Sequence, residues 1–193
     1  FGDTSFGWRI VGVTLGSLSP TLVFLTGKRL FGFWTGFLAF ILLILDPMLY
    51  VMARVAMLDI FLAFFVTLGF FLLAHKHYTL SAFTFGLACS VKFSGAFAII
   101  GAIAYLIYLK NYGSIKWFVT VPFIPFFSLY LPIIWSTGFQ SWMANIIFSL
   151  EWHIGLSVSH PDMAPPSGWL FNVKPFLLYE NISARANPFL YPA

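Results

Sequence analysis

Six apolar segments follow one another along residues 10–139, and none of them contains a charged residue. They are Ile10–Thr26, Leu30–Leu45, Ile60–Ala74, Tyr78–Val91, Phe93–Leu109 and Trp117–Phe139. A helix that crosses the hydrocarbon of a bilayer needs about 20 apolar residues, and several of these segments come close to that length. The pattern predicts an all-α fold: a polytopic transmembrane helix bundle of about six spans.

The pattern changes after Phe139. Within Phe139–His153 the apolar positions recur at helical spacing, which predicts an amphipathic helix lying in the outer membrane interface. Trp142 and Trp152 would suit the aromatic belt at that interface. We therefore divide the chain into a membrane bundle, residues 1–139, and an outer-face loop with the interfacial helix, residues 140–193.

Composition supports a bilayer as the solvent. The chain of 193 residues is 60% hydrophobic and only 8% charged, whereas a soluble domain carries about 25% charged residues. The net charge of +4 is scattered and forms no basic stripe, which argues against nucleic-acid binding. Cys89 is the only cysteine, so no disulfide can form within the chain. The sequence begins at Phe1, with no initiator Met and no recognisable signal peptide, so we expect the chain to be a segment of a longer protein.

The short loops give an orientation. Gly27–Arg29, His75–His77 and Lys110–Lys116 hold five basic residues and no acid, which places them in the cytoplasm by the positive-inside rule. The opposite loops hold Arg54 and Lys92. All six acids then fall on the outer side: Asp3, Asp46, Asp59, Glu151, Asp162 and Glu180. Acids do not set topology, so the segregation reflects either a polar working site on the outer face or chance combined with a long outer loop.

Three charged residues at span ends are candidates for chemistry. Arg54 and Asp59 lie at the outer start of the third span, where ionisable groups are costly unless they are paired or functional. Lys92 lies between two apolar segments and must reach the interface or meet an anion. An arginine fork and a lysine together suit a lipid phosphate. The simpler alternatives are a snorkelling Arg54, a helix-starting Asp59 and a loop lysine that only ends a hairpin.

The outer loop offers weaker candidates. His153 and His160 have no other His or Cys at metal-ligand spacing, and a lone histidine is more often a satisfied interface residue than a base. The sequence contains no Walker motif, no Gly-rich phosphate loop and no nucleophile elbow. We expect neither a metal nor a cofactor.

Four strings, in matching order, resemble prokaryotic protein O-mannosyltransferases. Phe6–Ile10 resembles the start of the family's second span, and Arg54–Asp59 resembles its Arg…Leu-Asp signature. Gly86–Gly95 resembles its Gly-x-x-x-Ser-Val-Lys-x-x-Gly element. His160-Pro161, with Trp169 and Pro175 downstream, resembles the family's His-Pro-Tyr…Trp-Trp…Pro loop, although Asp162 replaces the Tyr. The Ser-Val-Lys element is the most specific of the four.

The resemblance implies a membrane glycosyltransferase of the GT-C class. Such enzymes move mannose from a polyprenyl or dolichyl phosphate to Ser or Thr hydroxyls of secreted proteins at the outer or lumenal face. Arg54 and Lys92 match the phosphate-facing positions. Asp59, His153, His160 and Trp169 are expected near the site. The family's acidic base falls upstream of Phe1, so we assign no catalytic residue here and do not expect this segment to act alone.

Other readings stay open. A related GT-C enzyme that transfers aminoarabinose or another lipid-linked sugar would also use an Arg and a Lys to bind the lipid phosphate, but it would not share the Ser-Val-Lys string. An oligosaccharyltransferase is disfavoured because no Trp-Trp-Asp motif occurs. A transporter would be expected to show internal repeats and mid-span charges, which are not evident. The lack of a large soluble insert favours a prokaryotic cell membrane over the endoplasmic reticulum.

Overall fold

The computed structural model describes residues 4–155, 176–179 and 182–184, and most of these lie in helices. The helices, in chain order, are α1 (Ser5–Phe31), α2 (Phe33–Ile44), α3 (Pro47–Val55), α4 (Leu58–Ala74), α5 (Tyr78–Val91), the 3₁₀ turn η1 (Phe93–Gly95), α6 (Ala96–Tyr108), the 3₁₀ turn η2 (Tyr112–Ser114), α7 (Ile115–Thr120), α8 (Phe123–Thr137) and α9 (Phe139–Gly155). The predicted helical bundle is therefore confirmed.

One small element was not predicted. Strands β1 (Phe176–Tyr179) and β2 (Ile182–Ala184) pair in an antiparallel arrangement. Each is a run of three or four residues, which is too short for its period to distinguish a strand from a helix in the sequence.

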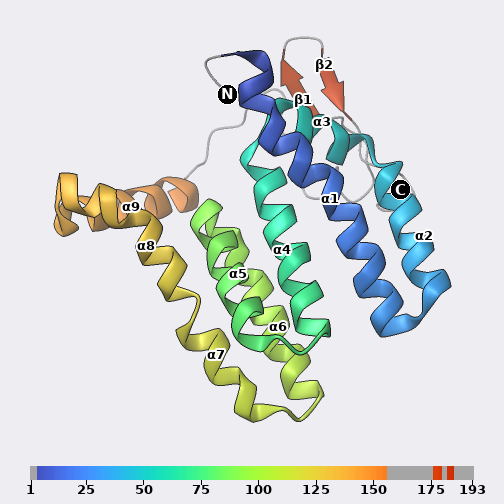
Figure 1. Cartoon of the computed structure of the whole chain (residues 1–193). Helices are drawn as coiled ribbons and strands as arrows, with labels where there is room; N and C mark the ends of the chain where they lie inside the picture. The colour runs from blue at the N-terminus through green and yellow to red at the C-terminus, as the bar shows by residue number, and fades with distance from the viewer. Residues whose placement is uncertain (1–3, 156–175, 180–181, 185–193) are drawn as a thin grey trace.

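The helices run side by side in alternating directions (Figure 1). Helix α1 packs against α2, α3 and α4; α4 packs against α5; and α5 packs against α8. Helix α6 contacts α4, α5 and α7. Figure 1 shows α9 lying across the end of α8 instead of continuing its axis. The amphipathic helix predicted after Phe139 is confirmed as a helix, and Gly138, with φ of 85°, makes the sharp bend before it.

The ends of some helices differ from prediction. Lys28 and Arg29 were expected in a loop, but both lie in the last turn of α1, where basic side chains interact favourably with the helix dipole. The helix ends instead at Gly32, whose φ of 100° suits glycine. The last apolar segment, Trp117–Phe139, is interrupted at Val121 and Pro122, between α7 and α8, because proline cannot donate the backbone hydrogen bond of a continuous helix.

Two helical stretches among the described residues are long and apolar enough to cross a membrane, Phe6–Phe31 and Tyr112–Thr137. Helices α2 and α3 would make a third, broken span, because they pass the same test together but are bent by 58°. Helices α4 and α5 and the stretch Phe93–Tyr108 are apolar but shorter. The membrane character is thus supported, while the number of about six spans stays a prediction.

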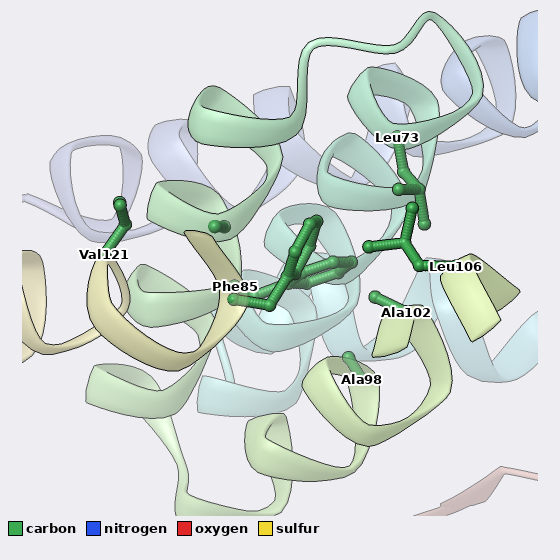
Figure 2. Close-up of a cluster of buried hydrophobic side chains, with 8 residues drawn as sticks. Leu73, Phe85, Ala98, Ala102, Leu106 and Val121 are labelled. Carbon is green, nitrogen blue, oxygen red and sulfur yellow. The ribbon is translucent and has the colours of Figure 1, made fainter. Parts of the chain in front are cut away.

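The core lies where α4, α5, α6 and α7 meet (Figure 2). Phe85 of α5 is fully buried at its centre, between Leu73 of α4 and the α6 face that carries Ala102 and Leu106. A Cβ on Gly69 of α4 would collide with the Phe85 ring, so this glycine is what allows α4 and α5 to approach closely. The tight α4–α5 contact fixes how these two helices meet at the ends away from the His75–His77 turn.

Candidate functional site

Lys92 stands at the point where the chain leaves α5. Its backbone is extended, with φ of −156° and ψ of 134°, and its N–H donates to the Ala88 carbonyl at 3.1 Å. The chain then folds back so closely that a Cβ on Gly95 would lie 2.6 Å from the Ala88 carbonyl carbon. Any side chain at residue 95 would push this turn off α5. Glycine at that position is therefore required for Lys92 to stand at the helix end.

The glycine at the start of the same motif sets the distance between α5 and α8. A Cβ on Gly86 would lie 2.5 Å from the Pro122 carbonyl oxygen. The Ser90 hydroxyl donates to the Gly86 carbonyl at 2.9 Å, and the Tyr130 hydroxyl of α8 reaches the Ser90 carbonyl at 3.4 Å. The residues of the Gly-x-x-x-Ser-Val-Lys-x-x-Gly motif thus pack the last turn of α5 against its neighbours, and Lys92 follows directly after that turn.

Lys92 meets an acid from the neighbouring helix. Its ammonium donates to the Asp59 carboxylate, with 2.9 Å between Nζ and Oδ1. The two side chains are 51% and 40% exposed, so the pair is accessible and contributes on the order of 1 kcal/mol or less to stability. An ammonium has three N–H donors, and this bond uses one of them. The pair therefore fixes where the ammonium lies and leaves donors free for a ligand.

Arg54 and Asp59, which were both expected at the start of the third span, do not share a helix. Helix α3 ends at Ala56, whose φ of 56° is left-handed, and α4 begins at Leu58. Arg54 consequently lies in the last turn of α3 and Asp59 in the first turn of α4, where a carboxylate favours the helix dipole. The helix break reorients the two side chains independently.

Arg54 is exposed, and its guanidinium lies over the Tyr50 ring at 5.6 Å. Among the described residues it has no hydrogen bond or ion pair, so its fork of donors is available. The α3–α4 connection and the end of α5 lie at the same end of the bundle (Figure 1). The structure thus places two cations, Arg54 and Lys92, with one acid, Asp59, at one end of the bundle. This arrangement can bind an anionic group but has no evident redox or nucleophilic chemistry.

An aromatic cluster stands beside this end of α5. Trp142 of α9 is only 5% exposed and contacts the rings of Tyr130 and Phe139, with centroid distances of 5.7 and 5.6 Å. Trp142 was expected in the interfacial aromatic belt; the α8–α9 bend turns its indole against the protein, and its depth in a bilayer stays a prediction. Its N–H has no hydrogen-bond partner among the described residues. Trp152, by contrast, is 53% exposed, as an interfacial residue would be.

The remaining candidates lie at the end of α9 and beyond it in the chain. His153 falls in the last turn of α9, while His160 and Trp169 lie outside the described residues. Within the described part of the chain, no group of three or more His, Cys, Asp or Glu side chains could hold a metal ion.

Comparison with known proteins identifies the family. The profile of the dolichyl-phosphate-mannose-protein mannosyltransferase family matches residues 1–153. The chain belongs to this family. Over 78 residues it is 40% identical to the polyprenol-phosphate-mannose–protein mannosyltransferase of Corynebacterium glutamicum, which covers 40% of this chain and 15% of that protein. Over 71 residues it is 42% identical to the proteins of the same name from two Mycobacterium tuberculosis strains, covering 36% of this chain and 14% of theirs. No solved structure matches the chain.

Membership of the mannosyltransferase family confirms the resemblance seen in the sequence and does not favour the aminoarabinose-transferase or transporter alternatives. The matches cover about a seventh of the curated relatives' length. The sequence analysis did not pair Asp59 with Lys92, although a signal was present. The two residues are almost equidistant from the turn at His75–His77, so an α-helical hairpin brings them level with each other.

Proposed function

We propose that this chain belongs to an enzyme that transfers mannose from a polyprenyl-phosphate-mannose donor to Ser or Thr hydroxyls of secreted proteins. The observation that carries the proposal is the presentation of Lys92 by the family's Gly-x-x-x-Ser-Val-Lys-x-x-Gly element, at the same bundle end as the exposed Arg54. Family membership and the names of the bacterial relatives support the reaction type.

The chemistry explains why two cations would be needed. The bond between the anomeric carbon of mannose and the phosphate oxygen breaks, and a bond from that carbon to the acceptor oxygen forms. The hydroxyl proton passes to a base, and polyprenyl phosphate leaves with one more negative charge than the donor phosphate carried. Arg54 and Lys92 would stabilise this developing charge more strongly in the transition state than in the bound donor, which lowers the barrier.

Asp59 has a positioning role in this proposal. Its bond to Lys92 holds the ammonium at the helix end, where it can donate to a phosphate without first losing side-chain entropy. We do not assign Asp59 as the base, because its carboxylate is already bonded to the Lys92 ammonium. His153, His160 and Trp169 remain candidates for contacts to the acceptor.

Mannosyl transfer tests the proposal. Membranes that contain the full-length protein carrying this chain are given a polyprenyl-phosphate-mannose donor and a Ser/Thr peptide. Replacing a donor that stabilises transition-state charge typically lowers the rate about a hundredfold to a thousandfold. We expect such a loss for Lys92→Ala and Arg54→Ala at unchanged protein levels, and little change for Lys116→Ala, a cation at the opposite end of the bundle. Full transfer in both variants, or no transfer by a folded parent, would refute the proposal.

The bacterial relatives and the apolar helices support a location in a prokaryotic cell membrane. The site would then face the exterior, because the opposite end carries the basic residues that the positive-inside rule assigns to the cytoplasm. Reaction of a single cysteine placed at Arg54 or Lys92 with an impermeant reagent, in intact cells, measures this orientation directly.

A further inference from the structure

The end of the bundle opposite Lys92 carries only basic charged side chains among the described residues. They come from the end of α1, the α4–α5 turn and the stretch between α6 and α7: Lys28, Arg29, Lys76, Lys110 and Lys116. All five are exposed, and none of their side chains has a hydrogen bond or ion pair with another described residue. Unlike Lys92, which is paired with Asp59, these five cations have no described side chain that would compete with an external anion.

Two of these lysines occupy a backbone conformation that favours glycine. Lys76 and Lys110 have φ of 64° and 57°, and each follows the last turn of a helix. The hydrogen bonds at the two turns are the same. The N–H of the lysine donates to the carbonyl three residues earlier at 2.9 Å, and the N–H of the next residue donates to the carbonyl five residues earlier, also at 2.9 Å. This is the helix ending in which glycine or asparagine is usual, yet both turns carry lysine.

The two turns are held next to each other by the core. Leu73 accepts the bond from the Lys76 N–H, and Leu106 accepts the bond from the Asn111 N–H that closes the second turn. Both leucines are buried in one cluster, and Figure 2 shows their side chains pointing toward one another. The residues after the lysines also match, because His77 and Asn111 have nearly equal backbone angles. Two turns with the same hydrogen bonds, each with an exposed lysine at its end, thus lie side by side.

The surroundings favour a lipid over a soluble anion. Tyr108 and Tyr112, on either side of the second turn, are 81% and 62% exposed, as aromatic residues at the headgroup level of a membrane are. The ammonium of Lys116 lies over the Trp117 ring at 4.9 Å, which holds another cation at the same depth. Apolar helices leave this end toward the bilayer interior. Charge complementarity at headgroup depth points to the phosphate of an anionic phospholipid.

We propose that the paired turns of Lys76 and Lys110 form a binding site for the phosphate headgroup of an anionic phospholipid such as phosphatidylglycerol. The lysines occupy strained positions because the headgroup needs a cation at each turn tip. This site lies at the other membrane face from the mannosyl-transfer site and does not depend on that activity.

Native mass spectrometry of the purified full-length protein, with graded phosphatidylglycerol or phosphatidylcholine, tests the site. A basic residue near an anionic surface favours binding by about fivefold. We expect the double variant K76N/K110N to lose roughly 25-fold in phosphatidylglycerol binding and nothing in phosphatidylcholine binding. Asn is chosen because it is neutral and tolerates positive φ. K76R/K110R should keep the preference, as should R9Q, which removes an exposed cation of α1 at the opposite end of the bundle.

Several results would overturn the site. Unchanged phosphatidylglycerol binding by K76N/K110N would mean that the lysines do not hold the headgroup. An equal loss in K76R/K110R would show that turn structure matters and charge does not. An equal loss in R9Q would mean that the protein's net charge, and not these two turns, sets the lipid preference. A parent that shows no lipid preference, but captures an acidic peptide through these lysines, would assign the turns to a protein partner instead.

Discussion

Alanine at residue 86 should separate α5 from α8, and the structure gives the size of the effect. The new Cβ would lie 2.5 Å from the Pro122 oxygen, 2.6 Å from Pro125 Cγ and 2.7 Å from Pro122 Cα. Ordinary van der Waals contact begins at 3.4 Å, so the oxygen contact is about 0.9 Å too short. Two of the three atoms belong to backbone and cannot rotate away. One of the two helices must therefore move.

The matched control is Gly101→Ala in α6, where the nearest atom to the new Cβ is Phe70 Cζ at 3.7 Å. Both substitutions gain the same helix propensity, about 0.5–1 kcal/mol, because alanine loses less backbone entropy than glycine. The difference between the two variants is then the overpacking cost alone, typically about 1–3 kcal/mol. We expect the upper half of that range for Gly86→Ala.

The assay is the free energy of unfolding of the full-length protein in mixed detergent micelles, with mannosyl transfer measured on the same preparations. The free energy of unfolding of the Gly86→Ala variant should be about 2–3 kcal/mol lower than that of the Gly101→Ala variant. It should also lose transfer activity, because moving α5 against α8 displaces the Ser90–Tyr130 contact just before Lys92. Equal unfolding free energies for the two variants would refute the close α5–α8 packing on which the presentation of Lys92 depends.

Three further substitutions examine individual contacts. Asp59→Asn should change the free energy of unfolding by less than about 1 kcal/mol, yet lower the kcat of mannosyl transfer about tenfold. Asp59→Glu should recover part of that activity. A large loss of stability in Asp59→Asn would mean that the pair with Lys92 stabilises the fold and does not position the ammonium. Ser81→Ala removes the 2.8 Å bond from its hydroxyl to the Gly69 carbonyl and should cost about 0.6–1.7 kcal/mol, whereas no change would mean that water or another group replaces the bond. Phe85→Ala opens a cavity between α4 and α6 and should cost about 3–5 kcal/mol, with Phe85→Leu much milder; equal effects would argue against a packed core there.

The sequence predicted the helices well because long charge-free runs allow little else in a membrane. It failed at the ends of helices. Lys28 and Arg29 were assigned to a loop because charges usually end an apolar run, but the backbone ends at Gly32, where φ turns positive. Arg54 and Asp59 were both placed at the start of the third span, and nothing in residues 54–59 signals a helix end between them. The left-handed conformation of Ala56, which separates them, is stabilised by tertiary packing and cannot be predicted from local helix propensity.

Within the candidate site, the sequence identified the charged residues but not how they combine. Lys92 was expected to meet an anion, and that anion was taken to be a lipid phosphate. The structure supplies Asp59 first, because hairpin geometry joins residues far apart in the chain. The same limit applies to Trp142, whose burial depends on the bend at Gly138 between α8 and α9. Pattern reasoning assigns a residue to a face of its own helix and does not know which neighbour will cover that face.

The shortness of α5 has a consequence for the membrane itself. Its 14 residues rise about 21 Å, while the hydrocarbon of a bilayer is about 30 Å thick. Charged groups stand at its end, and leaving Lys92 and Asp59 within hydrocarbon would cost far more than deforming the lipid. If α5 crosses the bilayer, as the sequence predicts, headgroups must dip toward the helix end and the leaflet is hollowed above the Lys92–Asp59 pair. Under the proposed function, the donor phosphate at Lys92 would then lie lower than its neighbours, and the sugar that it carries would be brought down to the protein surface.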